Sequence, residues 1–461
     1  MDYRRAFKNK RITLLGLGLL GRGVGDAEFL AKCGAQVIVT DKKTETELAA
    51  SVAKLKKYPN VTFRLGGHRK EDFEDCDMVL KAAGVPLDSP EIAAARAAGV
   101  PVTMSTALFA KYAIAAGAKI VGVTGTRGKT TVAHMIHHSL ISAFAKASAD
   151  RRAFLGGNVR GISTLSMLPD VRKGDVAVLE LDSWQLQGFG DLKISPNISV
   201  FTNLMPDHQN YYKDMDEYFT DKANIFRHQY QGDALIIGKS VEEKVNAARP
   251  QVAPQIPKAI PADWELKIVG EHNRENAAFA NAALQALGLS DDEIKTGLES
   301  FEGVEGRLQF VRELNGVKMY NDNNATTPEA TIAALRALNQ NVRPRRSNIL
   351  IIIGGADKGL DMTELTKEIN QNCKKVILLA GTGTDALLQA NSYKLQAPVS
   401  GPFSSLSHAV QDALNNAYAG DVINVSEGVY YGEGSGGLWI IKKINLTLAG
   451  GWNKDFTDRN P

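Results

Sequence analysis

A short run of residues near position 125 has the composition and spacing of a phosphate-binding loop. Residues 120–123 are apolar and predict a buried strand, which breaks at Gly125 and Gly128 before a helical pattern opens at Lys129. Glycines let backbone N–H groups face an anion, the N-terminus of a helix adds partial positive charge, and a lysine adds a full charge. This stretch therefore indicates a site for the phosphates of a nucleotide.

The loop departs from the strict phosphate-loop pattern, in which a glycine stands six residues before the lysine. That position holds Val123, so the match is to the shorter sequence Gly-Thr-x-Gly-Lys-Thr. Thr130 is placed to give its hydroxyl to a magnesium ion that shares the phosphates. A glycine-rich turn without a ligand is the alternative. The residues that we assign to the phosphates are Gly125, Thr126, Gly128, Lys129, Thr130 and Thr131.

The composition is that of an ordinary globular protein. Of the 461 residues, 44% are hydrophobic and 23% are charged, and a chain of this length has room for about three domains. A formal net charge of +3 does not argue for nucleic acid. Cys33, Cys76 and Cys373 lack the spacing of a disulfide framework or a zinc site. No apolar run reaches the roughly 20 residues of a membrane helix. We expect a cytoplasmic monomer with no nucleic-acid or membrane partner.

A second glycine-rich turn lies near the start of the chain. A short apolar strand leads into Gly16, Gly18 and Gly21, which match the spacing GxGxxG ahead of a predicted helix. Asp41 ends the next predicted strand, where a dinucleotide-binding fold places the acidic residue that holds a ribose. Residues 78–81 form a further strand that ends at the same edge. The pattern leaves two alternatives, a dinucleotide site and a tight turn in a Rossmann-like domain.

Polar residues follow several apolar strands after the phosphate loop, which is where a parallel sheet collects its site. Glu180 ends one of these strands, and a carboxylate beside a phosphate loop is the usual second ligand of magnesium. The alternative for Glu180 is a solvated strand end. His208 follows another strand, next to Asp207, and its alternative is a structural histidine. Lys222 lies in an amphipathic helix, where helical spacing alone makes it a surface lysine.

In their order, the motifs of this chain resemble those of the Mur ligase family. The resemblance covers residues from about 10 to about 421, and it rests on the segments GTRGKTT, GGN, ELDSWQL, NLMPDH, DKANIF, GEHNREN, EGRLQF, YNDNNATTPEAT and GGADKG. It implies an α/β fold of three domains. These are a Rossmann-like UDP-binding domain (1–107), a central P-loop ATPase-like domain (108–304) and a Rossmann-like C-terminal domain (305–421).

The resemblance also implies an activity. Within the family, the chain is most similar to the branch that adds D-glutamate to UDP-N-acetylmuramoyl-L-alanine in peptidoglycan precursor synthesis, with ATP and Mg²⁺, through an acyl phosphate. Relatives that add L-alanine or a diamino acid usually carry a histidine in the loop that corresponds to residues 320–328, and this chain has none there. The GxGxxG turn would then hold UDP and no NAD.

The resemblance assigns roles to the residues that match its motifs. The UDP-substrate would contact Gly18, Leu19, Leu20, Gly21, Asp41, Gly84, Asn158 and Ser183. ATP would also contact Asn273, Asn276, Arg307 and Asp322. D-glutamate would contact Thr326 and Lys358. Magnesium would be held by Thr130, Glu180, His208 and Lys222, the last of which matches the lysine that the family carbamylates. The catalytic set would be Lys129, Glu180, His208, Lys222 and Arg307, where Arg307 reaches the γ-phosphate or, as its alternative, is a solvated linker arginine.

The chain departs from the family pattern at two places. Asp182 stands where many relatives carry a serine, and its role stays open because it would add negative charge near a diphosphate. After residue 421, an atypical β-rich tail (422–461) replaces the loop that holds the D-glutamate carboxylate in the family. The tail resembles the opening of a parallel β-helix and is too short to form one alone. We expect a fusion or a misjoined reading frame, in which residues 422–425 still serve as a sheet strand.

Three functions stay open on the sequence. The first is an active D-glutamate ligase. The second is the same scaffold, which binds both nucleotides but is impaired in amide formation because the C-terminus is replaced. The third is a non-catalytic nucleotide-binding module.

Overall fold

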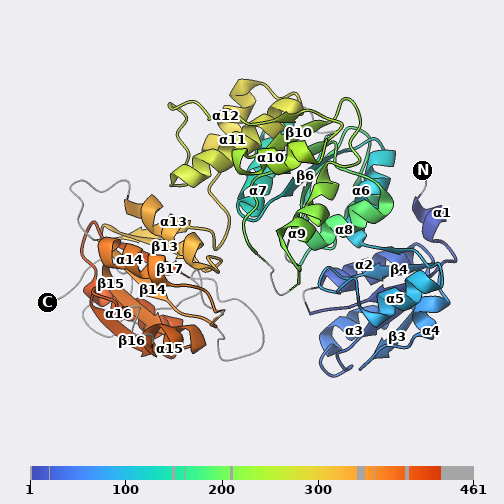
Figure 1. The fold of residues 1–461 in the computed structure, drawn as a ribbon, viewed down its shortest axis with the longest axis horizontal. Coiled ribbons are helices and arrows are strands. Elements are labelled where there is room, and N and C mark those ends of the chain that lie inside the picture. The colour runs from blue at the N-terminus through green and yellow to red at the C-terminus, as the bar shows by residue number, and fades with distance from the viewer. Residues whose placement is uncertain are drawn as a thin grey trace. The chain divides into compact units, whose positions relative to one another are not determined.

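The computed structural model describes residues 3–19, 21–147, 151–159, 161–207, 211–339, 348–357, 359–389 and 394–426. Two compact units divide the chain: the first contains residues 1–261 and 276–298, and the second contains residues 262–275 and the chain from 299 onward. Two sheets lie in the first unit and one in the second, each with helices against it (Figure 1). The predicted three-part α/β architecture is confirmed, whereas the boundaries at residues 107, 304 and 421 stay predictions.

The first sheet has five parallel strands in the order β3-β2-β1-β4-β5. The strands are β1 (Arg11–Leu15), β2 (Gln36–Asp41), β3 (Val61–Leu65), β4 (Met78–Lys81) and β5 (Val102–Thr103). The helices are α2 (Arg22–Lys32), α3 (Ala49–Leu55), α4 (Glu71–Glu74) and α5 (Pro90–Ala97), and a short helix, α1 (Tyr3–Phe7), precedes the sheet. The strand order reverses at β1, which β2 and β4 flank, and an α/β sheet binds its ligands outside the carboxyl ends of strands at such a point.

The second sheet has six parallel strands in the order β11-β10-β9-β6-β8-β7. The strands are β6 (Lys119–Thr124), β7 (Ala153–Gly157), β8 (Val176–Glu180), β9 (Ile198–Phe201), β10 (Ala234–Ile237) and β11 (Pro254–Gln255). The helices are α6 (Ser105–Ala115), α7 (Lys129–Ala147), α8 (Ser183–Leu192), α9 (Met215–Lys222), α10 (Glu242–Ala247), α11 (Glu271–Ala286) and α12 (Asp291–Ser300). Helices on both faces bury β8 and β9 completely, which explains why these strands read as unbroken apolar runs.

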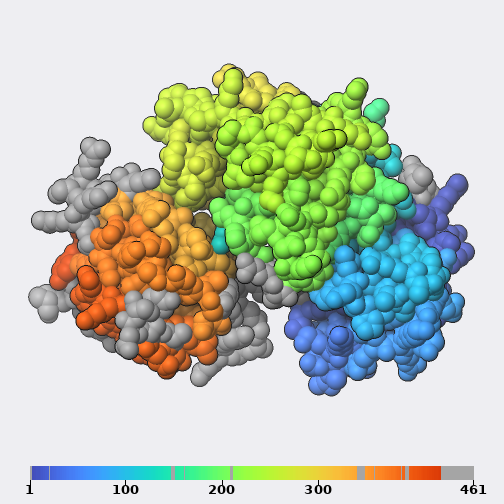
Figure 2. Space-filling model, viewed as in Figure 1, coloured from blue at the N-terminus to red at the C-terminus, as the bar shows by residue number. Residues whose placement is uncertain are grey.

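The third sheet has the order β12-β13-β17-β14-β15-β16, and only the pairing of β12 with β13 is antiparallel. The strands are β12 (Gln309–Leu314), β13 (Val317–Asp322), β14 (Ile349–Ile353), β15 (Cys373–Leu379), β16 (Val399–Phe403) and β17 (Val422–Ser426). The helices are α13 (Pro328–Asn339), α14 (Thr363–Asn372), α15 (Thr382–Gln389) and α16 (Leu406–Asn416). In the space-filling view the side chains of this sheet and its helices, drawn from orange to red, form one closely packed body (Figure 2).

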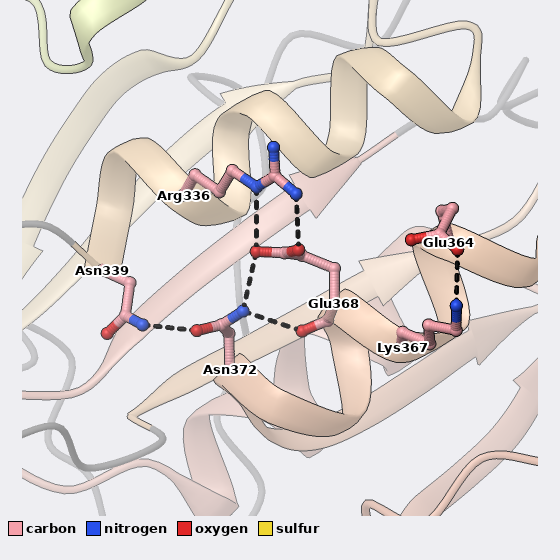
Figure 3. A network of polar contacts seen from close by, with 6 residues as sticks. All are labelled: Arg336, Asn339, Glu364, Lys367, Glu368 and Asn372. Carbon is pink, nitrogen blue, oxygen red and sulfur yellow. Dashed lines mark hydrogen bonds and ion pairs between the residues drawn. The ribbon is translucent and has the colours of Figure 1, made fainter.

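Polar contacts join α13 to α14 on one face of the third sheet (Figure 3). Arg336 donates to both carboxylate oxygens of Glu368, at 3.2 and 3.1 Å. Asn372 donates to the same carboxylate at 3.0 Å and accepts from Asn339. Arg336 is largely exposed, so we expect the network to fix the helix register more than to add stability.

Strand β17 begins the predicted tail and lies in the middle of the third sheet. The expectation that residues 422–425 form a sheet strand is confirmed, and residues 427–461 lie outside the described residues. Val422 packs in the apolar cluster of α13 and α14, whereas Ile423 and Val425 pack on the opposite face with α16.

Among the helices of the described ranges, none has the length and apolar content that a membrane crossing needs.

One residue of β17 conflicts with this central place. Asn424 is fully buried, and neither its amide nitrogen nor its amide oxygen has a hydrogen-bond partner among the described residues. Its neighbour Ser426 is satisfied, because its hydroxyl lies 2.8 Å from that of Thr331 on α13. Burying an amide without partners costs free energy that an apolar side chain would not. Asn424 is therefore a weak point in the core of the second unit.

We predict that Asn424→Leu stabilises the second unit by about 1–3 kcal/mol, because it replaces an unsatisfied buried amide with an apolar side chain of similar volume. Thermal unfolding followed by calorimetry measures the change. Asn415→Leu, at an exposed position on α16, is the matched control and should leave the unfolding temperature unchanged. A lower unfolding temperature for Asn424→Leu would show that the amide has partners.

Candidate active site

The predicted phosphate loop joins the carboxyl end of β6 to the first residue of α7. Gly125 and Gly128 adopt φ angles of +142° and +82°, which residues with side chains rarely take. A Cβ atom on Gly125 would lie 2.0 Å from the hydroxyl oxygen of Thr202, and one on Gly128 would lie 2.5 Å from the amide oxygen of Asn276. Both glycines are therefore required by the space available, and Asn276 of α11 packs directly against the loop.

Residues after β9 support the loop from behind. Thr202 donates its hydroxyl to the carbonyl of Arg127 at 2.6 Å. Asn203 accepts the N–H of Arg127 on its side-chain oxygen at 2.8 Å and the N–H of Thr126 on its carbonyl at 3.0 Å. Thr202 and Asn203 were not among the predicted site residues, although their place at the end of a strand beside the loop was a usable signal.

Lys129 lies over its own loop. Its Nζ donates to the carbonyl oxygens of Gly125 and Thr126, at 2.9 and 3.0 Å. Thr130 and Thr131 follow in the first turn of α7, and both are partly exposed. A cation and the N-terminus of a helix of 19 residues therefore lie at the same end of the second sheet, which is an arrangement suited to phosphate.

Glu180 ends β8, the strand beside β6, and it pairs in register with Val123. Its side chain is buried, so the alternative of a solvated strand end is wrong. The backbone carbonyl of Glu180 accepts the N–H of Asn158 at 2.7 Å. Gly157 lies so close to the same carbonyl that a Cβ atom there would be 2.1 Å from it. The strand end that carries Gly157 and Asn158 thus rests on Glu180.

Lys222 is buried, with 1% of its surface exposed, and the interpretation of it as a surface lysine is wrong. Its Nζ donates to the carbonyl of Gly125 at 2.8 Å and to the hydroxyl of Thr124 at 3.3 Å, and it lies 4.7 Å from the ring centre of Tyr218. Burial holds the pKa of Lys222 well below its usual range, and the charge of Lys129 acts in the same direction. Helical spacing missed this because Lys222 lies on the buried face of α9, one turn after the buried Tyr218, and not with the exposed polar residues of that helix.

Asp182, whose role was open, caps α8. Its carboxylate accepts the N–H of Gln185 at 2.7 Å, and the side-chain oxygen of Gln185 accepts the N–H of Asp182 at 3.4 Å. This reciprocal pair is a capping box. Because aspartate caps a helix as well as serine does, the departure from the family pattern needs no change of chemistry. Ser183, the next residue, is buried in the first turn of α8.

A cavity lies at the carboxyl end of the first sheet. Four of the residues predicted to contact the UDP-substrate line it: Gly18, Leu19, Asp41 and Gly84. The far wall comes from the second sheet and its connections, through Gly157 and Gln185 among others. Gly21, Asn158 and Ser183 are not part of this lining, and Leu20 lies outside the described residues.

Asp41 organises the glycine-rich turn. One carboxylate oxygen accepts the N–H groups of Leu17 and Gly18, at 2.9 and 3.1 Å, and the other accepts the N–H of Lys43 at 2.9 Å. These bonds hold the turn between β1 and α2 in shape. A contact of Asp41 with a ribose stays a prediction, and it would have to use the lone pairs that these three bonds leave.

Three charged residues in the lining of the cavity were not predicted. They are Arg22, Asp26 and Lys81. Burial raises the pKa of Asp26 to about 6, although a hydrogen bond from Ser163 opposes the shift. Burial also lowers the pKa of Lys81 to about 8. Arg22 and Asp26 lie next to the GxGxxG turn in the sequence, so their nearness to that motif was the signal that could have found them.

Most of the remaining predicted residues belong to the second unit. Asp322 is buried, accepts the N–H of Leu308 at 2.9 Å and has a pKa raised to about 7 by burial. Arg307 is exposed and donates to the carbonyl of Asn324 at 2.9 Å. Thr326 lines a small cavity with apolar residues of α14 and α15. Asn273 donates to a backbone carbonyl at 2.8 Å. His208 and Lys358 lie outside the described residues.

Family profiles match the chain in three successive parts. A profile described as "Mur ligase MurD-like, N-terminal domain" matches residues 10–104, one described as "Mur ligase middle domain" matches residues 123–256, and one described as "Mur ligase, glutamate ligase domain" matches residues 306–426. The three matched regions correspond to the three sheets.

Curated proteins are similar over most of the chain. The UDP-N-acetylmuramoylalanine--D-glutamate ligase of Roseiflexus sp. (strain RS-1) is 36% identical over 456 residues, which cover 91% of this chain and 94% of that protein. The protein of the same name from Clostridium kluyveri is 31% identical over 452 residues, which cover 92% and 93%.

Solved structures share the fold at low sequence identity. UDP-N-acetylmuramate-alanine ligase MurC from Thermotoga maritima is 20% identical with a TM-score of 0.58, and the match covers 92% of this chain and 96% of that one. MurF ligase from Thermotoga maritima in complex with ADP is 15% identical with a TM-score of 0.55, covering 92% of each chain.

A phosphate loop on one sheet and a glycine-turn cavity on the neighbouring sheet, followed by a third α/β unit, define a multidomain nucleotide-dependent enzyme fold. The profile matches and the 31–36% identity to curated relatives make the assignment more specific. The chain belongs to the Mur ligase family.

The shifted pKa of Asp26 predicts a pH window for stability. Its folded-state pKa of about 6 lies above the ordinary value of 3.8, so the folded state binds more protons than the unfolded state between these values. The contribution of Asp26 to stability must therefore fall as pH rises from about 4 to about 6 and stay constant above that.

We predict that Asp26→Asn, which mimics the protonated carboxyl, gains stability relative to the native chain across this window. Unfolding temperatures of both proteins measured from pH 4 to 8 give the difference, with Asp88→Asn at an exposed position as the control. A difference that shrinks from pH 4 to 6 would contradict the shift.

Proposed function

We propose that this chain joins D-glutamate to the carboxylate of UDP-N-acetylmuramoyl-L-alanine, with ATP as the phosphoryl donor and Mg²⁺ as the metal. The named relatives are D-glutamate ligases over nearly their full length, and ligases of the Mur family depend on ATP. The sites that such a reaction needs are a place for a nucleotide sugar, a phosphate loop and a contact for the amino acid.

The observation that carries the proposal is the continuity of two sites within the first unit. Gly157 lines the cavity at the glycine-rich turn and also packs on the carbonyl of Glu180. Glu180 in turn pairs with β6, the strand that runs into the phosphate loop. A nucleotide sugar bound in the cavity would therefore have its acyl end on the same wall that carries the phosphoryl site.

The chemistry requires two anions to meet, and the charges of the loop are suited to this. The substrate carboxylate attacks the γ-phosphorus of ATP, the bond to the β–γ bridging oxygen breaks, and ADP leaves with an acyl phosphate formed. The amine of D-glutamate then attacks the acyl carbon, loses a proton and displaces inorganic phosphate. Lys129 and the N-terminus of α7 would offset the repulsion in the first step by holding the phosphates.

The donor set near the loop fits a magnesium ion only in part. Among the described residues, no three His, Cys, Asp or Glu side chains are grouped as a metal site. Glu180 is a buried carboxylate beside the loop, and Thr130 offers a hydroxyl. Glu180 and Thr130 would hold the magnesium ion together with the ATP phosphates, and the ion would supply positive charge that offsets the negative charge of the phosphates.

Lys222 would complete this set as a carbamate. A lysine kept neutral by burial has a free lone pair, which can attack CO₂ to form an N–C bond with loss of one proton to solvent. The low pKa and the position of Nζ beside Gly125 support this reaction. The product would replace a buried neutral amine with a buried anion near Lys129, whose charge would stabilise it.

The second unit would supply the amino acid and part of the ATP site. Asp322 and Arg307 would contact ATP, and Thr326 with Lys358 would contact D-glutamate. Thr326 lies at the rim of a small cavity, and the buried carboxylate oxygen of Asp322 has no hydrogen-bond partner among the described residues. Both features support these roles.

The experiment that tests the function measures phosphate release from ATP in the presence of UDP-N-acetylmuramoyl-L-alanine. We expect release that requires D-glutamate and equals the amount of UDP-N-acetylmuramoyl-dipeptide formed, with L-glutamate as the control amino acid. Binding of both nucleotides without product would instead support the scaffold impaired in amide formation. Absence of nucleotide-sugar binding would contradict the proposal.

We predict that Lys222→Met keeps or raises the unfolding temperature, because an apolar chain of similar length replaces a buried amine. The same change should lower turnover by about 100-fold or more, because a group that stabilises charge during the reaction is lost. Calorimetry and the phosphate assay measure the two effects. Lys244→Met, at an exposed salt bridge on α10, is the control. Full turnover by Lys222→Met would exclude any role of this lysine in the chemistry.

A further inference from the structure

The first turn of α2 reaches across the nucleotide-sugar cavity to the loop that follows β7. Arg22, the first residue of α2, donates from Nη2 to the side-chain oxygen of Asn158 at 3.0 Å and from Nε to the carbonyl of Val159 at 3.1 Å. Arg22 also lines the cavity. One guanidinium therefore joins the first sheet to the loop after the second sheet's edge strand.

The contact determines which way the amide of Asn158 faces. Arginine has donors and no acceptor, so the atom that it contacts must be the amide oxygen. The NH₂ group of Asn158 is then directed away from Arg22 and stays a donor. Its backbone N–H is already committed to the carbonyl of Glu180. Asn158 is thus held at its side-chain oxygen by Arg22 and at its backbone N–H by the carbonyl of Glu180.

A second contact, one turn further along α2, fixes the same loop. Ser163 donates its hydroxyl to the carboxylate of Asp26 at 2.6 Å, and it also accepts the N–H of Ser166. A Cβ atom on Gly25 would lie 2.5 Å from the Cβ of Ser163, so the helix and the loop touch without room for a side chain. Arg22 therefore holds Asn158 and Val159 against α2, and Asp26 holds Ser163.

We propose that Arg22 is a positioning residue for the nucleotide-sugar substrate: by holding the amide oxygen of Asn158, it directs the Asn158 NH₂ group to a phosphate oxygen of the UDP moiety. The inference rests on the proposed function. It names a phosphate oxygen because the glycine-rich turn at the start of α2 places backbone N–H groups and a helix N-terminus at the same edge. Asp26 and Ser163 keep the loop in place for this contact.

An arginine in such a cavity could act in two ways, through Asn158 or by direct contact with the phosphates. If Arg22 acts through Asn158, its removal should cost nothing once the Asn158 amide is gone. If Arg22 contacts the phosphates itself, its removal should weaken binding whether or not Asn158 is present. A double-mutant cycle measures the difference between these cases.

The experiment uses the full chain, and calorimetric binding of UDP-N-acetylmuramoyl-L-alanine is measured for Arg22→Met, Asn158→Ala and the double variant. We expect each single variant to bind about tenfold more weakly, because each loses one charge-assisted or amide hydrogen bond. We expect the double variant to bind no more weakly than Asn158→Ala. In steady-state assays, KM for the nucleotide sugar should rise, with kcat and KM for ATP within about twofold of the native values.

Arg22→Lys provides a second variant that keeps the charge but presents one donor group in place of a fork. We expect it to recover only part of the loss, because a single ammonium cannot hold the Asn158 amide and the Val159 carbonyl in the same geometry. Arg69→Met, at an exposed position of the first sheet's region, is the control and should bind normally.

Additive losses in the double variant, or full recovery by Arg22→Lys, would overturn the proposal in favour of direct phosphate contact. Unchanged binding by Arg22→Met in a native-like fold would overturn it as well. Failure of the native chain to bind the nucleotide sugar would instead reject the proposed function, so the two failures are distinguishable.

Discussion

The approach of Thr202 to Gly125 is the constraint on which the site depends. A Cβ atom added to Gly125 would lie only 2.0 Å from the hydroxyl oxygen of Thr202, so a residue with a side chain would clash there. This closeness lets the residues after β9 bond to the loop after β6, and the loop is then fixed by strands rather than by its own flexible backbone. Lys129 and Lys222 both donate to the carbonyl of Gly125, so the same residue binds one partly exposed amine and one buried amine.

Burial then gives these groups their chemistry. Two amines near one carbonyl cannot both stay charged at low cost, and Lys222, which is more deeply buried, has the lowered pKa. The same principle acts in the cavity of the first sheet, where burial shifts Asp26 and Lys81 towards their neutral forms. The first unit therefore surrounds its sites with oriented backbone donors and with ionisable side chains whose pKa values are shifted by burial. Such an environment suits anionic substrates, because water is displaced by donors that are already oriented.

Local patterns predicted much of the fold and part of the site. The strand, glycine turn and helix around Lys129 follow from spacing alone, and so does the place of Glu180 at a strand end. Tertiary packing decided the rest. The depth of Lys222 depends on which face of α9 meets the loop, and the helix cap made by Asp182 depends on where α8 begins. Arg22 gains its role from a loop more than 130 residues later in the chain, a distance at which no local pattern carries information. The polar Asn424 gave no sign that its strand would be central.

The central claim is that a substrate carboxylate is activated by transfer of a phosphoryl group before the amine arrives. It is tested most directly by labelling the carboxylate of UDP-N-acetylmuramoyl-L-alanine with ¹⁸O and analysing the released phosphate by mass spectrometry. Attack of the carboxylate on ATP, followed by displacement by D-glutamate, must carry one ¹⁸O atom per turnover into phosphate. Phosphate without the label, released together with the amide product, would contradict the acyl-phosphate route and the arrangement of charges proposed around Gly125.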